Sequence, residues 1–158
     1  MENKAKSLVS LMAMLLLAAC ECGPRAGLDG QEVVIDNDLG ADSKDFIANA
    51  GDRVFFGFDK SSLSQESEAT LLRQVEWLKA HQNRNVLIEG HCDERGTREY
   101  NLGLGERRAD AAARFLVDHG ISADRVRTVS YGKDRPIEAA GSKSEIYRLN
   151  RVGISVIE

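Results

Sequence analysis

Positive charge is not concentrated anywhere in this chain of 158 residues, which carries 21 Lys and Arg against 25 Asp and Glu. Broad binding to nucleic acid needs a clustered basic face, so the charge balance argues against a nucleic-acid partner. Internal repeats and low-complexity tracts are also missing. The length accommodates one ordinary domain with additional segments, and a hydrophobic content of 42% is enough for one folded core.

A long hydrophobic run is missing as well. Residues 8–19 are apolar apart from Ser10, and Lys4 and Lys6 precede them. A transmembrane helix needs about 20 apolar residues, so this run is too short to span a bilayer comfortably. A short basic region followed by an apolar core is typical of a signal peptide, which we predict for residues 1–19. A short buried helix is the alternative.

Cysteine is scarce, and the three residues present form no disulfide framework. Cys20 ends the stretch Leu17–Cys20 (LAAC), which resembles the lipobox of bacterial lipoproteins. The resemblance implies that Cys20 becomes the first mature residue and is lipidated. Each buried methylene contributes about 0.8 kcal/mol, so two or three chains anchor a protein firmly. In lipoproteins of this kind, the residue after the lipidated cysteine influences which membrane the protein reaches, and Glu21 favours the outer membrane over the inner one. Ordinary signal cleavage remains the alternative.

The other two cysteines, Cys22 and Cys92, are interpreted as free and packed, respectively. A disulfide between them stays open. Residues 20–50 are rich in Gly, Asp, Asn and Ala, and we predict a lipidated N-terminus followed by a flexible tether. A short strand at residues 33–35 is compatible with this composition. Residues 51–158 are predicted to form the folded domain.

Periodicity predicts the order β-α-β-α-β-β for this domain. The predicted strands and helices cover residues 53–59, 65–81, 85–91, 99–119, 125–132 and 150–158. Ser64 is the expected N-cap of the first helix, and Gly120 is expected to end the second. Residues 133–145 are predicted to be a loop. The fold class is α/β (an α+β sandwich), with both helices packed on one face of a small mixed sheet.

The second predicted helix has a core face made largely of small residues. At about 100° per residue, that face consists of Leu102, Gly105, Ala109, Ala112, Ala113 and Leu116. Asn101, Leu104 and Arg108 lie along one flank of it, and residues 107, 114 and 118 point into solvent. A boundary arginine often pairs with a neighbouring acid, so this remains an alternative role for Arg108. Trp77 is predicted to make a flank contact on the first helix.

The stretch from His91 to Glu94 contains four metal-ligand residue types in a row. Adjacent strand residues point to opposite faces, which argues against a metal site and against a Cys–His nucleophile. A paired-carboxylate hydrolase would use Asp59 and Asp93, since both follow strands. Nothing in the sequence indicates the raised pKa that such a mechanism needs. We therefore expect no metal, no cofactor and no enzymatic activity.

Three segments carry a resemblance to a known family: GHCDERGTREYNLGLGERRA (90–109), FFGFDK (55–60) and SYGKDRP (130–136). They are similar to the OmpA-like C-terminal domain family and, together with the lipobox, to its lipoproteins of the Tol-Pal system. The resemblance covers about residues 54–156. It implies noncovalent binding to peptidoglycan through the diaminopimelate of the stem peptide. It also implies a periplasmic domain that contributes to envelope integrity and cell division, with the periplasmic TolB, the inner-membrane TolA and further proteins of the outer membrane as partners.

The family's functional residues correspond to a charged pair and a pocket wall. The pair is Asp93 and Arg108, and the wall consists of Phe58, Asp59, Thr97, Asn101 and Leu104. Diaminopimelate has a free end that carries both an ammonium and a carboxylate, so its recognition needs one anion and one cation. Asp93 can accept hydrogen bonds from the ammonium, and Arg108 can hold the carboxylate in a two-pronged fork. Gly96 would let the intervening backbone approach closely.

One departure concerns the last strand. Family members often carry Asn-Arg-Arg-Val, whereas this chain has one arginine fewer at residues 150–152. A shift of one residue changes which side chains face the core, so the register of this strand and the role of Arg151 are not predicted. Two other functions remain open: a protein-interaction module whose main ligand is TolB or TolA, and a wall hydrolase.

Overall fold

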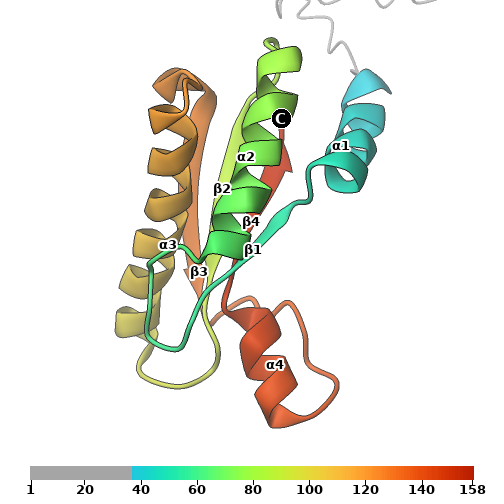
Figure 1. The fold of residues 1–158 in the computed structure, drawn as a ribbon. Helices are drawn as coiled ribbons and strands as arrows, with labels where there is room; N and C mark the ends of the chain where they lie inside the picture. The colour runs from blue at the N-terminus through green and yellow to red at the C-terminus, as the bar shows by residue number, and fades with distance from the viewer. Residues whose placement is uncertain (1–36) are drawn as a thin grey trace, which may run out of the picture. The chain divides into compact units, whose positions relative to one another are not determined.

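The computed structural model describes residues 37–158 (Figure 1). The predicted signal peptide, Cys20, Cys22 and the strand at 33–35 lie outside the described residues. The elements in chain order are α1 (Asn37–Asn49), β1 (Arg53–Phe55), α2 (Gln65–Ala80), β2 (Val86–His91), α3 (Arg98–Asp118), the 3₁₀ turn η1 (Ala123–Arg125), β3 (Val126–Gly132), α4 (Lys143–Asn150) and β4 (Val152–Ile157). Within residues 37–158, no helix has the length and apolarity needed to cross a membrane.

The predicted mixed sheet is confirmed. Its strand order is β1-β4-β2-β3. Strands β2 and β3 are parallel and are joined through α3, whereas β4 runs antiparallel to both β1 and β2. Helices α2 and α3 lie side by side on the same side of the sheet (Figure 1). Because β2 and β4 are antiparallel, the end of β2, the start of β4 and the start of α3 meet at one edge of the sheet.

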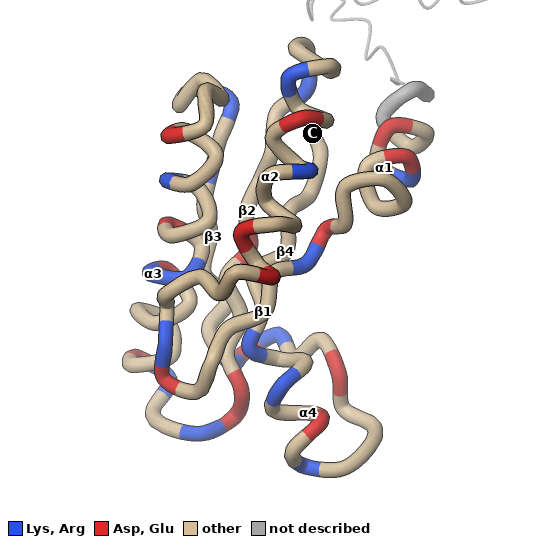
Figure 2. Tube along the Cα trace, in the orientation of Figure 1, with Lys and Arg blue, Asp and Glu red and all other residues tan. Residues whose placement is uncertain are grey.

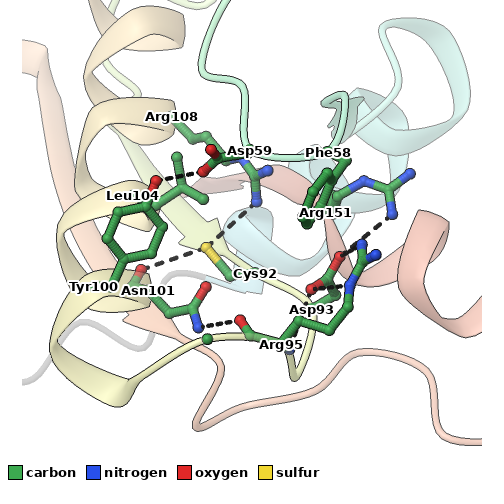
Figure 3. Close-up of a pocket in the computed structure, with 11 residues that line it drawn as sticks. Phe58, Asp59, Cys92, Asp93, Arg95, Tyr100, Asn101, Leu104, Arg108 and Arg151 are labelled. Atoms are coloured by element: carbon green, nitrogen blue, oxygen red, sulfur yellow. Dashed lines mark hydrogen bonds and ion pairs between the residues drawn. The ribbon is translucent and has the colours of Figure 1, made fainter.

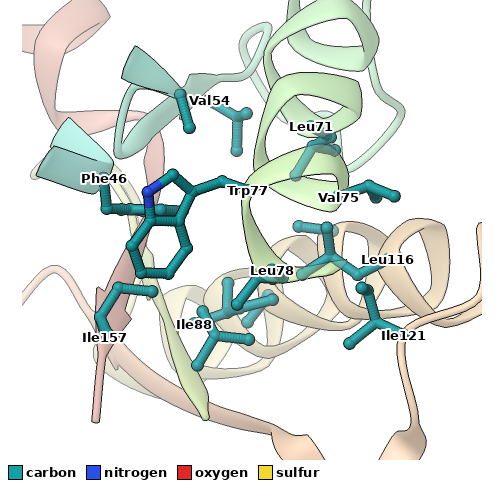
Figure 4. Packing of buried hydrophobic residues seen from close by; sticks show 14 of the residues in the cluster. Phe46, Val54, Leu71, Val75, Trp77, Leu78, Ile88, Leu116, Ile121 and Ile157 are labelled. Atoms are coloured by element: carbon teal, nitrogen blue, oxygen red, sulfur yellow. The ribbon is translucent and has the colours of Figure 1, made fainter. Parts of the chain in front are cut away.

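The core lies between the two long helices and the sheet (Figure 4). Leu71 and Leu78 of α2 are fully buried, as are Ile88 of β2 and Leu116 of α3. The helical spacing predicted for α2 is confirmed, and the Ser64 side chain caps it by accepting a hydrogen bond from the Ser67 backbone N–H. Apolar periodicity therefore predicts correctly which face of α2 is buried.

Two glycines bring α3 against the sheet. A Cβ added at Gly90 in β2 would lie 1.9 Å from the Gly105 carbonyl oxygen, and one added at Gly105 would lie 2.9 Å from the Gly90 oxygen. The core face predicted for α3 is confirmed at Gly105, whereas Leu102 is 47% exposed. The prediction for Leu102 is wrong. With Gly105 against Gly90, α3 is rotated about its axis relative to the predicted orientation, and the predicted flank (Asn101, Leu104 and Arg108) faces the protein interior.

The structure resolves the register of the last strand. Gly153, Ser155 and Ile157 face the helices, although the apolar alternation runs through residues 152, 154 and 156. A Cβ on Gly153 would lie 3.1 Å from Val54, and the Ser155 hydroxyl donates to the buried Gln74 side chain over 2.9 Å. Tight contact with β1 and one buried polar pair therefore determine which face is covered.

The predicted tether is wrong over α1. This helix lies beside α2 (Figure 1), and the Phe46 ring packs edge-on against Trp77 with ring centroids 5.1 Å apart. The Trp77 indole N–H donates to Asp45 over 2.7 Å, and Arg84 pairs with Asp42 at 2.5 Å. Polar composition concealed this helix because, among its residues 40–49, whose side chains the structure describes, Phe46 is the only fully buried large one.

Two further boundaries differ from the prediction. Residues 143–150 form α4 instead of continuing the predicted loop, and the Ser142 side chain caps this helix by accepting from the Glu145 backbone N–H. The Ser-x-x-Glu spacing is a capping-box signal that identifies such a start. Strand β1 ends at Phe55 instead of Asp59, since pairing with β4 stops there and the chain turns away towards Arg108.

Candidate functional site

The structure has a pocket at the edge where β2 ends and α3 begins. Its volume is about 180 Å³. The loop after β1 and the first residue after α4 complete it. Its lining consists of Phe58, Asp59, Cys92, Asp93, Arg95, Gly96, Tyr100, Asn101, Leu104, Arg108 and Arg151. In Figure 3, Asp93 lies with Arg95 and Arg151 on one side of the pocket, and Arg108 lies with Asp59 and Tyr100 on the other.

Asp93 is the anionic group of this pocket. Its carboxylate accepts hydrogen bonds from the Arg95 backbone N–H at 3.3 Å, from Arg95 Nε at 3.1 Å and Nη2 at 2.5 Å, and from Arg151 Nη1 at 3.4 Å. Burial by itself raises the pKa of Asp93, but the hydrogen bonds from Arg95 and then Arg151 outweigh it and hold that pKa below its ordinary value. Asp93 therefore remains ionised in the folded protein.

Arg108 is the buried cation. The whole residue is 0% exposed. Its guanidinium donates to the carbonyl oxygens of Lys60 at 2.9 Å, His91 at 2.8 Å and Gly57 at 3.1 Å, and to the Cys92 sulfur at 3.3 Å. Burial lowers the pKa of Arg108 from its high ordinary value, although arginine remains a cation under all physiological conditions.

These contacts change the expected role of Arg108. Four of its five N–H groups have acceptors within the described part of the chain, so a two-pronged fork on a ligand carboxylate would have to replace at least one of them. The same contacts tie the loop after β1 to the end of β2. Arg108 thus supplies positive charge to the pocket and also holds two of its walls together.

Most of the predicted wall residues do line this pocket. Phe58 and Asp59 come from the loop after β1, and Asn101 and Leu104 come from the first turns of α3. Thr97 does not belong to the lining. It is the N-cap of α3, and its hydroxyl accepts a hydrogen bond from the Tyr100 backbone N–H at 3.2 Å. Thr97 therefore positions the helix that carries the wall.

His91 and Cys92 contact different parts of the structure. The His91 ring faces the Arg135 carbonyl oxygen with Nδ1 at 3.0 Å, whereas the Cys92 thiol donates to the Asn101 carbonyl oxygen at 3.3 Å. Burial raises the pKa of Cys92 despite the nearby Arg108, so the thiol is protonated at neutral pH. A nucleophilic cysteine needs the opposite shift.

The Asp93 carboxylate also lacks the environment of a glycosidase acid. A general acid at neutral pH requires a raised pKa, whereas that of Asp93 is lowered. Asp59 accepts a short hydrogen bond from the Tyr100 hydroxyl. Within residues 37–158, no group of three or more His, Cys, Asp and Glu side chains is arranged to hold a metal ion. The arrangement is suited to binding a small charged ligand.

Sequence reasoning missed Arg95 and Tyr100 as lining residues and left Arg151 unassigned. Arg95 follows Asp93 by two residues, a spacing that allows a local side-chain pair in a loop. Arg151 donates to the Phe56 carbonyl oxygen at 3.0 Å and reaches Asp93 from the position between α4 and β4, far away in the sequence. No local pattern could have indicated that second contact.

Charges elsewhere on the described chain are mixed. Figure 2 shows basic and acidic residues interspersed over the helices and loops. Several form exposed pairs, such as Arg98 with Asp134 at 2.8 Å. Isolated pairs of this kind contribute little to stability. The buried charges of the pocket stand out against this background.

Comparison with known proteins identifies the family. The OmpA family matches residues 55–149, which is more than half of the chain. The chain belongs to the OmpA family. A curated relative from Rhizobium meliloti, a peptidoglycan-associated lipoprotein, is 38% identical over 99% of this chain and 91% of its own length. Another relative of that name, from Mesorhizobium japonicum, is 43% identical over 82% of this chain and 79% of its own length.

A solved structure agrees in fold. The crystal structure of the peptidoglycan-associated lipoprotein from Burkholderia pseudomallei has a TM-score of 0.64 and 36% sequence identity. The similarity covers 68% of this chain and 90% of that chain. Family and fold predictions from the sequence are thereby confirmed. Neither the family nor these relatives carries the name of an enzyme.

Proposed function

We propose that this chain binds peptidoglycan noncovalently, through the diaminopimelate of the stem peptide, in the pocket between Asp93 and Arg108. The observation that carries the proposal is that one ionised carboxylate and one buried guanidinium lie on different sides of a single pocket of about 180 Å³. The free end of diaminopimelate has one ammonium and one carboxylate. Its ammonium would bind at Asp93, and its carboxylate would lie towards Arg108.

The cellular role follows from this binding and from the predicted lipid at Cys20. A chain anchored in the outer membrane by its N-terminus, with its folded domain on the cell wall in the periplasm, joins the two layers noncovalently. The names of the relatives, which combine a lipoprotein with peptidoglycan association, support this assignment. We assign the chain to the Tol-Pal system, with a role in envelope integrity and in constriction of the outer membrane during cell division.

Binding to sacculi tests the pocket directly. We expect Asp93→Asn to reduce the fraction of protein that sediments with diaminopimelate-containing sacculi by about tenfold or more, because a hydrogen bond to a charged group contributes roughly 1.5–3 kcal/mol. The neighbouring Glu94→Gln, which removes one charge from an exposed side chain outside this pocket, is the matched control and should bind as the wild type does. Full binding by a folded Asp93→Asn variant would disprove the pocket assignment.

The pH dependence of binding gives an independent test. The pKa of Asp93 is lower in the folded state than in the unfolded state, so its charged form is retained at neutral pH and is lost only as pH falls through the lowered value. We expect affinity for a diaminopimelate peptide to be level from pH 7 to about 4, the ordinary range of an aspartate, and to fall only below that range. Calorimetric titrations at pH 7, 5 and 3 measure this, and a midpoint near pH 6 would contradict it.

A second candidate function is binding to another periplasmic protein, with TolB as the main ligand and TolA as a further one. The observation that favours it is an exposed aromatic rim: Phe58 is 60% exposed and Tyr100 is 49% exposed, and both line the pocket. Aromatic side chains of this kind are enriched at protein interfaces. Competition between a muropeptide and TolB for the chain separates shared from distinct surfaces.

A further inference from the structure

Arg95 occupies the acidic side of the pocket. Its guanidinium holds the Asp93 carboxylate with two nitrogens, Nε at 3.1 Å and Nη2 at 2.5 Å. The Asp93 side chain is only 5% exposed, whereas the Arg95 side chain is 39% exposed. The cation that covers this carboxylate therefore belongs to the protein itself and lies at the mouth of the pocket (Figure 3).

Aromatic rings hold the Arg95 side chain in place. Its guanidinium carbon lies 4.0 Å from the centre of the Phe58 ring and 4.5 Å from the centre of the Tyr147 ring. Such cation–π contacts contribute modestly at exposed sites, about 0.5–1 kcal/mol each. The backbone is fixed separately, because the Asn101 amide donates to the Arg95 carbonyl oxygen at 2.7 Å. The side chain can therefore leave Asp93 without a movement of the loop.

Charge balance shows which ligand can take its place. The charged residues that line the pocket are Asp59 and Asp93 against Arg95, Arg108 and Arg151, an excess of one positive charge. The displaced guanidinium remains at the mouth of the pocket beside Phe58 and Tyr147, so the excess positive charge stays close to the bound ligand. A zwitterion adds no net charge there, whereas a plain amine adds a further positive charge and brings no carboxylate for Arg108.

We propose that Arg95 is a displaceable internal ligand that sets the specificity of this pocket, an inference that rests on the function proposed above. In the free protein it occupies the carboxylate that receives the ligand's ammonium. Binding requires exchange of one cation for another at Asp93. A ligand with an ammonium and a carboxylate at one end compensates for that exchange, and an ammonium without the carboxylate does not. Arg95 thus favours diaminopimelate over lysine at the same position of the peptide.

The test measures affinity for two stem peptides that differ only in this residue, diaminopimelate or lysine, by calorimetry with the full chain in detergent. We expect Arg95→Ala to bind the diaminopimelate peptide about fivefold to tenfold more tightly than the wild type, because the competing state is removed. Affinity for the lysine peptide should rise by a larger factor, so that the ratio between the two affinities falls.

Arg98→Ala is the matched control. Arg98 is an exposed arginine of the same segment that pairs with Asp134, and its removal lowers the net charge by the same amount without touching Asp93. It should leave both affinities unchanged. Tighter binding by Arg95→Ala alone, with a lower ratio, supports the inference. Unchanged or weaker binding by Arg95→Ala, or equal tightening by Arg98→Ala, overturns the role of Arg95 while the proposed function stands. If the wild type binds neither peptide, both the role of Arg95 and the proposed function are overturned.

Discussion

Replacement of Arg108 by alanine is expected to lower the free energy of unfolding by about 3 kcal/mol or more, in addition to any effect on ligand binding. The substitution removes the Arg108 donors from the carbonyl oxygens of Gly57, Lys60 and His91, of which His91 is buried, and leaves a cavity where a fully buried side chain stood. A buried polar group without a partner costs roughly 1–3 kcal/mol. Urea denaturation of the purified variant, followed by circular dichroism, measures the loss.

Arg108→Lys and Arg107→Ala complete this experiment. Lysine keeps the charge but lacks the planar fork that reaches three carbonyls, so Arg108→Lys should lose about 1–2 kcal/mol. Arg107 is the exposed neighbour on the same helix, and its replacement by alanine should change stability by less than about 0.5 kcal/mol. Wild-type stability of Arg108→Ala, with binding lost, would mean that Arg108 acts on the ligand alone.

Replacement of Gly90 by alanine is expected to destabilise the fold by about 3 kcal/mol or more, or to prevent folding. The added Cβ would lie 1.9 Å from the Gly105 carbonyl oxygen and 2.6 Å from its carbon, both backbone atoms that cannot move aside alone. Overpacking of a well-packed site typically costs about 1–3 kcal/mol, and this overlap is at the severe end. Thermal and urea unfolding of the variant test the expectation.

Gly103→Ala is the control for this substitution. Gly103 lies in α3 near Gly105, but a Cβ there meets only the flexible end of Arg107, at 3.4 Å. Alanine is a better helix residue than glycine by roughly 0.5–1 kcal/mol, so Gly103→Ala should stabilise the protein slightly. Equal losses for both variants would show that the close approach of α3 to β2 at Gly90 is not the cause of the loss.

The difference between these glycines illustrates what the sequence can predict. The small residues on one face of the second helix indicate close packing on a sheet, and that prediction is confirmed at Gly105 and Ala109. The rotation of α3 about its own axis depends on the close contact between Gly105 and Gly90. It exposes Leu102 and buries Arg108 completely, which the helical spacing of α3 alone does not specify.

The two helices that the sequence analysis missed have different physical causes. Helix α4 is short, but its cap at Ser142 and Glu145 is a local signal that could have been used. Helix α1 carries a mainly polar sequence and is stabilised by Phe46 against Trp77 and by Asp45 on the indole N–H. Those partners belong to α2, so the stabilisation of α1 is a tertiary effect.

The sequence by itself determined the family, the order and type of the main elements, and most of the residues that line the pocket. These features depend on local periodicity, caps and one long contiguous motif, all of which are written along the chain. Only the tertiary structure decided the states of the charged groups. Arg151 reaches Asp93 from the position just before the last strand, and Arg108 spans the carbonyls of Lys60 in the loop after β1 and of His91 at the end of β2. Such pairings depend on distances between segments far apart in sequence, and on the burial that makes an unpaired charge costly.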